Sequence, residues 1–116
     1  MTTSGELQDM PLRELRWRPR AHLDRESIAI YLGIECGVPR VAAETIARID
    51  KPLERVRLFP DSGGRFRDDR LARKEYRTAC AHPYTIYYTF DESTITVYRI
   101  LHQRQNLDDY AFMEWG

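Results

Sequence analysis

The stretch His82–Asn106, HPYTIYYTFDESTITVYRILHQRQN, decides the fold. Two runs rich in β-branched and aromatic residues, Tyr84–Phe90 and Thr94–His102, flank the short polar segment Asp91–Ser93. This composition is typical of two strands joined by a tight turn, so we expect a central β-hairpin. The hairpin ends in a polar and basic cluster. Its members are Arg99, His102, Gln103 and Arg104.

Side-chain alternation predicts which residues of the hairpin share a face. The expected sets are Tyr84, Ile86, Tyr88 and Phe90 in the first strand, and Ile95, Val97, Arg99 and Leu101 in the second. Because the second strand has apolar residues on both faces, we expect it to be central and covered. Arg99 stands among apolar neighbours, which leaves two interpretations: an ion pair with a carboxylate at the sheet end, or a β-bulge that turns the side chain outward.

The chain preceding this hairpin predicts a strand and two helices. Alternation over Glu14–Arg18 favours a short strand that ends at Pro19. Three- and four-residue spacing of apolar residues over Arg20–Glu35 favours an amphipathic helix. Gly37 then suits a helix end and Pro39 a helix start. The apolar stripe of this second helix comprises Ala42, Ile46, Ile49, Leu53 and Val56.

Several weaker signals complete the expected elements. Pro52 inside the second helix predicts a kink or break, since proline removes a backbone hydrogen bond. Residues 61–64 suggest a turn and 65–74 have no clear pattern, whereas Glu75–Cys80 reads as another strand. Asn106 suits the N-cap of a short C-terminal helix.

Length and composition predict one domain. The chain has 116 residues, 42% hydrophobic and 31% charged, and we assign 12–116 to the domain and 1–11 to an extension. No apolar run approaches the length of a membrane span and no signal-peptide pattern opens the chain, so we expect a cytoplasmic protein without membrane contact. Cys36 and Cys80 lack metal-site spacing, which predicts free buried thiols, no metal and no cofactor.

The charges balance overall but are unevenly distributed. A formal net charge of +0 argues against a general nucleic-acid binder. Arginines nevertheless crowd residues 13–25 and 65–77. Such patches suit an acidic peptide or a phosphate backbone, and the alternative is a solvated face without a partner.

The order of the expected elements, together with their residues, resembles the RelE/ParE superfamily of bacterial toxins. The matching pieces are WRPRA from Trp17, the helix with Asp24 and Tyr31, the Leu58–Pro60 exit, and HPYTIYY followed by TVYRILHQRQN. We expect an α+β fold of order β-α-α-β-β-β, in which an N-terminal strand and a helical hairpin pack on a small, mainly antiparallel sheet. The resemblance implies the toxin of a type II toxin–antitoxin module, bound by an antitoxin as a hetero-oligomer.

Two toxin activities occur in this superfamily, and the resemblance leaves them to be weighed. ParE-like members poison DNA gyrase, and RelE-like members cleave mRNA on the ribosome. Metal-free RNA cleavage needs a proton acceptor, a proton donor and cations for the phosphate, which His102, Arg77 and Arg99 could supply. The Arg-Ile-Leu-His context and the acidic continuation at Asp108–Asp109 favour the ParE-like branch, which acts by binding.

We therefore favour a gyrase inhibitor with no catalytic residues. The alternatives are the ribonuclease and a non-toxic homologue that binds only its antitoxin. The residues expected to bind the target or the antitoxin are Arg65, Arg67, Arg73, Arg77, Arg99, His102, Gln103, Arg104 and Trp115.

Overall fold

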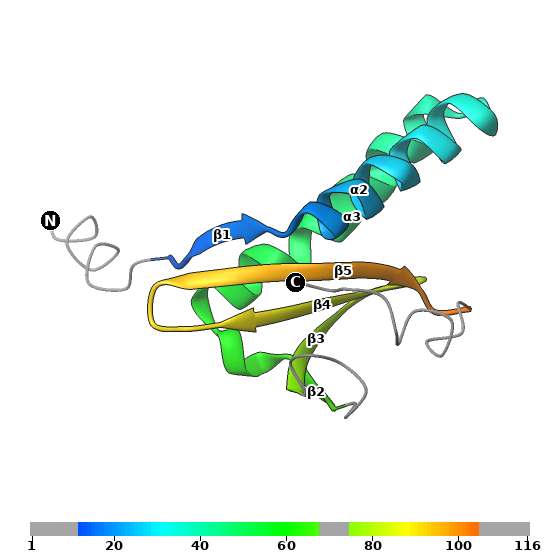
Figure 1. Ribbon diagram of the computed structural model, residues 1–116. Coiled ribbons are helices and arrows are strands. Elements are labelled where there is room, and N and C mark those ends of the chain that lie inside the picture. The colour runs from blue at the N-terminus through cyan, green and yellow to red at the C-terminus, as the bar shows by residue number, and fades with distance from the viewer. Residues whose placement is uncertain (1–11, 68–74, 105–116) are drawn as a thin grey trace, which may run out of the picture.

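Two helices lie on one face of a five-stranded sheet in the computed structural model, which describes residues 12–67 and 75–104 (Figure 1). The strands are β1 (Glu14–Trp17), β2 (Gly64–Arg67), β3 (Glu75–Ala81), β4 (Tyr84–Phe90) and β5 (Thr94–His102). The helices are α2 (Pro19–Ile30), the π-helical turn η1 (Tyr31–Glu35), α3 (Pro39–Leu58) and the 3-10 turn η2 (Pro60–Ser62). The predicted α+β class is confirmed.

The predicted hairpin forms the centre of the sheet, whose strand order is β1-β5-β4-β3-β2. β5 pairs antiparallel with β4 and parallel with β1. The Asp91 side chain closes the turn, because its Oδ1 accepts hydrogen bonds from the backbone N–H groups of Ser93 (2.9 Å) and Thr94 (2.8 Å). These hydrogen bonds lower the pKa of Asp91, since they favour its charged form.

A β-bulge in the hairpin changes the expected alternation of β5. Tyr88 is paired with Val97, whereas the preceding Tyr87 is paired with Arg99, so Tyr98 is an extra residue on β5. Ile100 consequently joins Val97 in the main core. Leu101 packs instead with Tyr76 on the opposite face. The predicted faces are thus correct for the first half of β5 and wrong after Tyr98.

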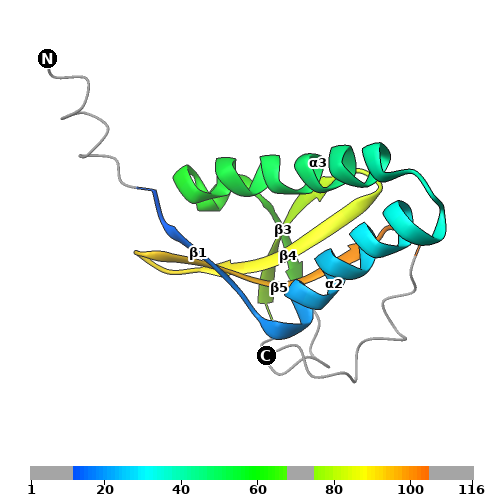
Figure 2. The same cartoon turned by 90° about the horizontal axis from the view of Figure 1, so that it is seen from above.

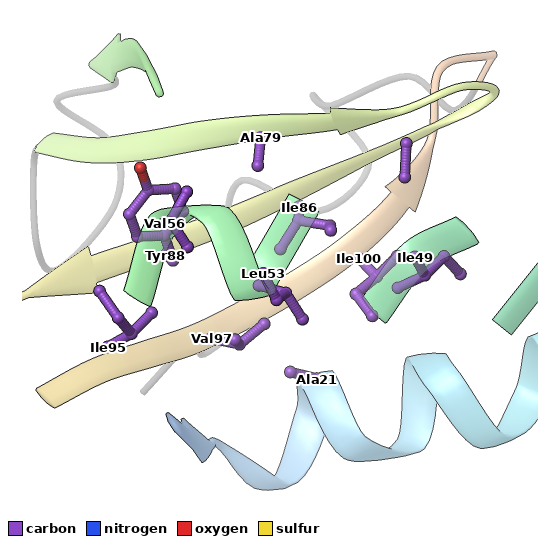
Figure 3. Packing of buried hydrophobic residues seen from close by; sticks show 11 residues of the cluster. Ala21, Ile49, Leu53, Val56, Ala79, Ile86, Tyr88, Ile95, Val97 and Ile100 are labelled. Atoms are coloured by element: carbon purple, nitrogen blue, oxygen red, sulfur yellow. The ribbon is translucent and has the colours of Figure 1, made fainter. Parts of the chain in front are cut away.

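The core lies between α3 and the sheet. Ile49, Leu53 and Val56 of α3 are 0–2% exposed, and Figure 3 shows them directed at the strands, where Ile86 and Val97 meet them. The predicted stripe of α3 is therefore confirmed in its buried members. These anchors lie on both sides of Pro52 and hold the helix on the sheet, and α3 runs without a break from Pro39 to Leu58. Of the predicted kink or break at Pro52, the break is therefore wrong.

The turn after α3 is fixed by a core tyrosine. Tyr88 is fully buried, and its hydroxyl donates a hydrogen bond of 2.7 Å to the carbonyl of Pro60. Gly63 passes so close that an added Cβ would lie 2.5 Å from the carbonyl oxygen of Thr78 and would also meet the Tyr88 hydroxyl. Only glycine fits there. This close approach leads the chain into β2, a strand that the sequence did not predict.

The end of the helical hairpin at which α2 and α3 are connected extends beyond the sheet. Figure 1 shows α2 and α3 side by side, with the connection between them lying beyond the strands. In α2 the one buried residue is Ala21, whereas Leu23 is 52% exposed and Ile30 51%. The expected buried stripe of α2 is therefore wrong for most of its length: α2 contacts β5 through Ala21, Asp24 and the partly buried Ile28, and its other large apolar residues stay exposed.

Two further observations concern the cysteines and the helices. Cys36 and Cys80 are free, as expected, but both are exposed rather than buried. Within residues 12–67 and 75–104, no helix is long and apolar enough to cross a membrane.

Candidate functional site

A groove of about 380 Å³ lies between α2 and the ends of β4 and β5. Its lining combines polar groups from α2 with aromatic and apolar groups from the sheet. The lining residues are Asp24, Ser27, Ile28, Tyr31, Tyr84, Ile100 and His102. The predicted hairpin contributes the last three, so the groove lies at the sheet end that the sequence had singled out.

The floor of the groove is built on a buried ion pair. β1 pairs with the edge of β5 only as far as Val97. Beyond that point the side chain of Asp24 in α2 binds the edge of β5. The Asp24 carboxylate accepts two hydrogen bonds from Arg99, at 2.7 Å and 3.0 Å. It also accepts one of 2.9 Å from the backbone N–H of Ile100. One carboxylate therefore accepts hydrogen bonds both from the backbone at the edge of β5 and from the side chain of Arg99.

This arrangement resolves the two interpretations of Arg99. The side chain pairs with a carboxylate, and a bulge does lie beside it, yet Arg99 is only 3% exposed. It does not contribute to an exposed basic edge, contrary to expectation. A bidentate pair in a buried position fixes α2 on β5 and leaves the guanidinium unable to reach a phosphate.

Tyr84 and His102 form the wall of the groove opposite α2. They are partners across β4 and β5, and their rings pack edge to face with centroids 5.3 Å apart. The Nδ1 atom of His102 accepts a 3.0 Å hydrogen bond from the backbone N–H of Arg104, which places the proton of the neutral ring on Nε2. Burial raises the pKa of Tyr84. Its hydroxyl is therefore a neutral donor at physiological pH.

The groove opens onto exposed apolar side chains at the end of the helical hairpin. Tyr31 belongs to both, since it lines the groove and is 56% exposed. A hydrogen bond with Cys36 raises the pKa of Tyr31. We define the hairpin surface as the exposed apolar residues Ile30, Tyr31, Ile34, Val38 and Val41. Ile34 is 75% exposed.

The hairpin surface is poor in charge. Between Ser27 and Ala43 the charged residues are Glu35 and Arg40. Contiguous exposed apolar residues with few charges are typical of protein interaction sites. The groove thus has a polar and aromatic lining, and the adjoining hairpin surface exposes apolar side chains.

Arg77, the other arginine suggested for RNA cleavage, lies away from the groove. It pairs with Tyr88, four residues from the level of Tyr84 and His102, or roughly 13 Å along the strand. Its guanidinium contacts Asp61 Oδ1 at 2.7 Å and the Gly63 carbonyl at 3.2 Å. Arg77 thus ties β3 to the turn after α3.

The remaining predicted binding residues fall into three groups. Arg65 and Arg67 are exposed on the edge strand β2, opposite Arg77 and Glu75. Gln103 and Arg104 are exposed beyond the end of β5, where the Gln103 amide is 3.8 Å from the sulfur of Cys80. Arg73, Trp115, the expected C-terminal helix and the extension 1–11 lie outside the described residues.

The α2 side of the groove and the exposure of the hairpin surface were not predicted from the sequence. A signal was present, because apolar residues from Leu23 to Val41 cover more of the helical circumference than one small sheet can bury. The low charge of the same segment is a second signal. In the described part of the chain no three His, Cys, Asp or Glu side chains gather as metal ligands.

Comparisons with known proteins agree with this architecture. A family model described as the ParE toxin of type II toxin–antitoxin system, parDE, matches residues 15–107. Among solved structures, the chain is similar to one titled "Chromosomal ParDE TA system from P. aeruginosa", with a TM-score of 0.60 and 18% sequence identity. That match covers 78% of this chain and 96% of that chain. A search of curated proteins found no match.

Proposed function

Because the chain belongs to the ParE toxin family of type II toxin–antitoxin systems, we propose that it inhibits DNA gyrase by binding. It would hold the topoisomerase in its DNA-cleaved state and perform no covalent chemistry of its own. A cognate antitoxin would neutralise it in the cytoplasm by forming a hetero-oligomer. The fold class and the family support this proposal, and the site chemistry supports binding over cleavage.

One observation carries the proposal: the hairpin surface and the groove expose apolar anchors beside satisfied polar groups. Ile34, Tyr31 and Ile30 are each more than half exposed. Exposed aliphatic and aromatic side chains at such a position stabilise a complex when a partner covers them. A protein that acts by occupying another protein needs a surface of this kind.

The groups suggested for RNA cleavage are engaged in the fold. Arg99 is bound by Asp24, Arg77 by Asp61, and the two arginines hold different parts of the molecule. His102 lies at the groove with a hydrogen-bonded Nδ1, and neither arginine is among the residues that line this groove. Phosphate stabilisation requires cations held at the reacting group. This arrangement favours the gyrase proposal over the ribonuclease alternative.

A supercoiling assay with purified gyrase and relaxed plasmid tests the proposal. The wild-type protein should inhibit supercoiling and accumulate cleaved plasmid. Ile34→Asp should abolish inhibition or weaken it by more than tenfold, because a charge would then replace an apolar anchor. Leu12→Asp is the matched control, since Leu12 is 48% exposed and lies on the N-terminal side of β1. It should inhibit like the wild type.

A second assay with translating ribosomes and message separates the alternatives. We expect intact message with the wild type and with His102→Ala. Message cleavage that His102→Ala abolishes would contradict the proposal and establish the ribonuclease. Inactivity in both assays, together with tight antitoxin binding, would identify a homologue without toxicity.

A further inference from the structure

One face of α3 carries a row of exposed cations. We define the cationic face as Arg40, Arg48, Lys51 and Arg55, all of which are exposed. At about 100° per residue these positions fall within a sector of about 80°, on the side opposite the buried stripe. They span about 22 Å along the helix axis. Figure 2 shows α3 along the outside of the molecule, with one side turned away from the strands.

Three other arginines of the fold are each bound to a carboxylate from another element. Arg25 contacts Asp50 at 2.6 Å, Arg77 contacts Asp61 at 2.7 Å, and Arg99 contacts Asp24 at 2.7 Å. These arginines hold elements together.

Arg40, Lys51 and Arg55 have a different environment. Within residues 12–67 and 75–104, no carboxylate is within ion-pair range of these three side chains. Arg48, the fourth cation of this face, donates a 3.3 Å hydrogen bond to the carbonyl of His82. Glu44 is the single acidic residue in the same sector. Contacts within the described part of the fold therefore account for Arg48 but not for Arg40, Lys51 and Arg55.

The composition of the cationic face indicates the class of its partner. A protein interface has an apolar centre from which charge is depleted. This sector has no apolar residue between Arg40 and Arg55, so it lacks such a centre. A phosphate backbone needs cations at intervals along a line and no apolar anchor. The face fits nucleic-acid phosphates better than an acidic peptide.

We propose that the cationic face of α3 contacts the phosphate backbone of duplex DNA. The setting rests on the proposed function, since a toxin bound to a cleaved topoisomerase–DNA complex would lie close to a duplex. The formal net charge of the chain is +0, so the contact with free DNA is weak, independent of sequence and strongly dependent on salt. Within a ternary complex the contact adds to binding at the hairpin surface, because both act at once.

Fluorescence anisotropy with a labelled DNA duplex, measured over a salt series from low to moderate concentration, tests the contact without gyrase. The wild type should bind at low salt. Lys51→Gln/Arg55→Gln should reduce the slope of log affinity against log salt by about two, one for each lost phosphate contact. The matched control is Arg16→Gln/Arg18→Gln, which makes the same change of net charge on exposed residues of the β1 segment. It should leave the slope unchanged.

A change of opposite sign gives a second test. Glu44→Gln removes the one negative charge from the sector and should strengthen DNA binding. Circular dichroism of each variant confirms the fold. No binding at low salt, or equal loss in the two double variants, would overturn the proposal. Loss of antitoxin binding with unchanged DNA binding would overturn it in favour of an acidic peptide.

The two proposals can fail separately. If the protein binds DNA through the cationic face but does not inhibit gyrase, the gyrase proposal fails and the phosphate contact stands. If it inhibits gyrase and Lys51→Gln/Arg55→Gln inhibits equally at every salt concentration, the contact has no part in the toxin complex and the inference fails.

Discussion

The two ends of the helical hairpin carry similar residues in opposite environments. At its base, Ile49 and Leu53 of α3 are 0% and 1% exposed, whereas Ile30 and Ile34 at its tip are 51% and 75% exposed. The strands lie beneath the base and end before the tip (Figure 1). Apolar spacing in a helix therefore predicts a surface that needs covering, but not whether the fold or a partner covers it. The base holds the fold, and the apolar side chains of the tip stay exposed.

The largest effect should come from breaking the ion pair at the base of α2. Asp24→Ala leaves Arg99 buried without its carboxylate and removes the acceptor for Ile100 N–H. We expect a loss of about 3–5 kcal/mol in the free energy of unfolding, measured by urea titration. Glu26→Ala, two residues along the same helix and exposed, should lose less than about 1 kcal/mol. Equal losses would contradict the structural role of Asp24.

The base and the tip can be compared directly with one kind of substitution. Leu53→Ala creates a cavity in the core and should cost about 2–5 kcal/mol of unfolding free energy. Ile34→Ala removes a side chain that is 75% exposed and should change stability by no more than about 0.5 kcal/mol. Urea titration of both proteins measures the difference. A large loss for Ile34→Ala would show that the tip belongs to the core.

A smaller effect concerns the hydrogen bond that fixes the turn after α3. Tyr88→Phe leaves the carbonyl of Pro60 without the buried hydroxyl that it accepts from, at a cost of about 1–3 kcal/mol in thermal or urea unfolding. Tyr98→Phe is the control for the loss of a hydroxyl. The Tyr98 ring packs edge to face on Tyr76 with centroids 5.2 Å apart, and phenylalanine keeps this ring. We expect Tyr98→Phe to unfold close to the wild type. The reverse order of stability would contradict this assignment.

The smallest effect is a dependence of the unfolding free energy on pH, caused by Asp91 in the turn between β4 and β5. Backbone hydrogen bonds from Ser93 and Thr94 lower the pKa of Asp91 in the folded state. Its contribution is therefore present above the usual carboxyl pKa of about 4 and is lost as pH falls through the lowered value. Asp91→Ala should melt below the wild type at pH near neutrality, and the gap should close in strong acid. Glu92→Ala, which leaves both backbone hydrogen bonds to Asp91 in place, is the control variant.

Much of the fold could be predicted because local patterns and tertiary contacts agree. The alternation of Tyr84–Phe90 and the stripe of Ile49, Leu53 and Val56 specify faces that the structure buries. β2 could not be predicted, since Gly64–Arg67 has little pattern of its own and becomes a strand by pairing with β3. The position of the bulge at Tyr98 was not predicted for a related reason, because side-chain alternation alone cannot show where the register of two strands shifts.

The site was predictable in its sheet residues but not in its helix residues. His102 and Tyr84 lie at the groove because they end paired strands. Arg99 was identified as unusual, yet its partner Asp24 is 75 positions earlier in the chain, and no local pattern connects them. The exposure of the hairpin surface depends on where the sheet ends, which is a tertiary property.

Hydrogen–deuterium exchange of the full chain, alone and with its cognate antitoxin, tests most directly whether the groove and the hairpin surface bind the partner. We predict that the antitoxin slows exchange at amides of residues 27–41 and of the end of β5, while amides of Ile49–Val56, already protected in the core, change little. Protection confined to β1 and β2, with unchanged exchange over residues 27–41, would contradict the account.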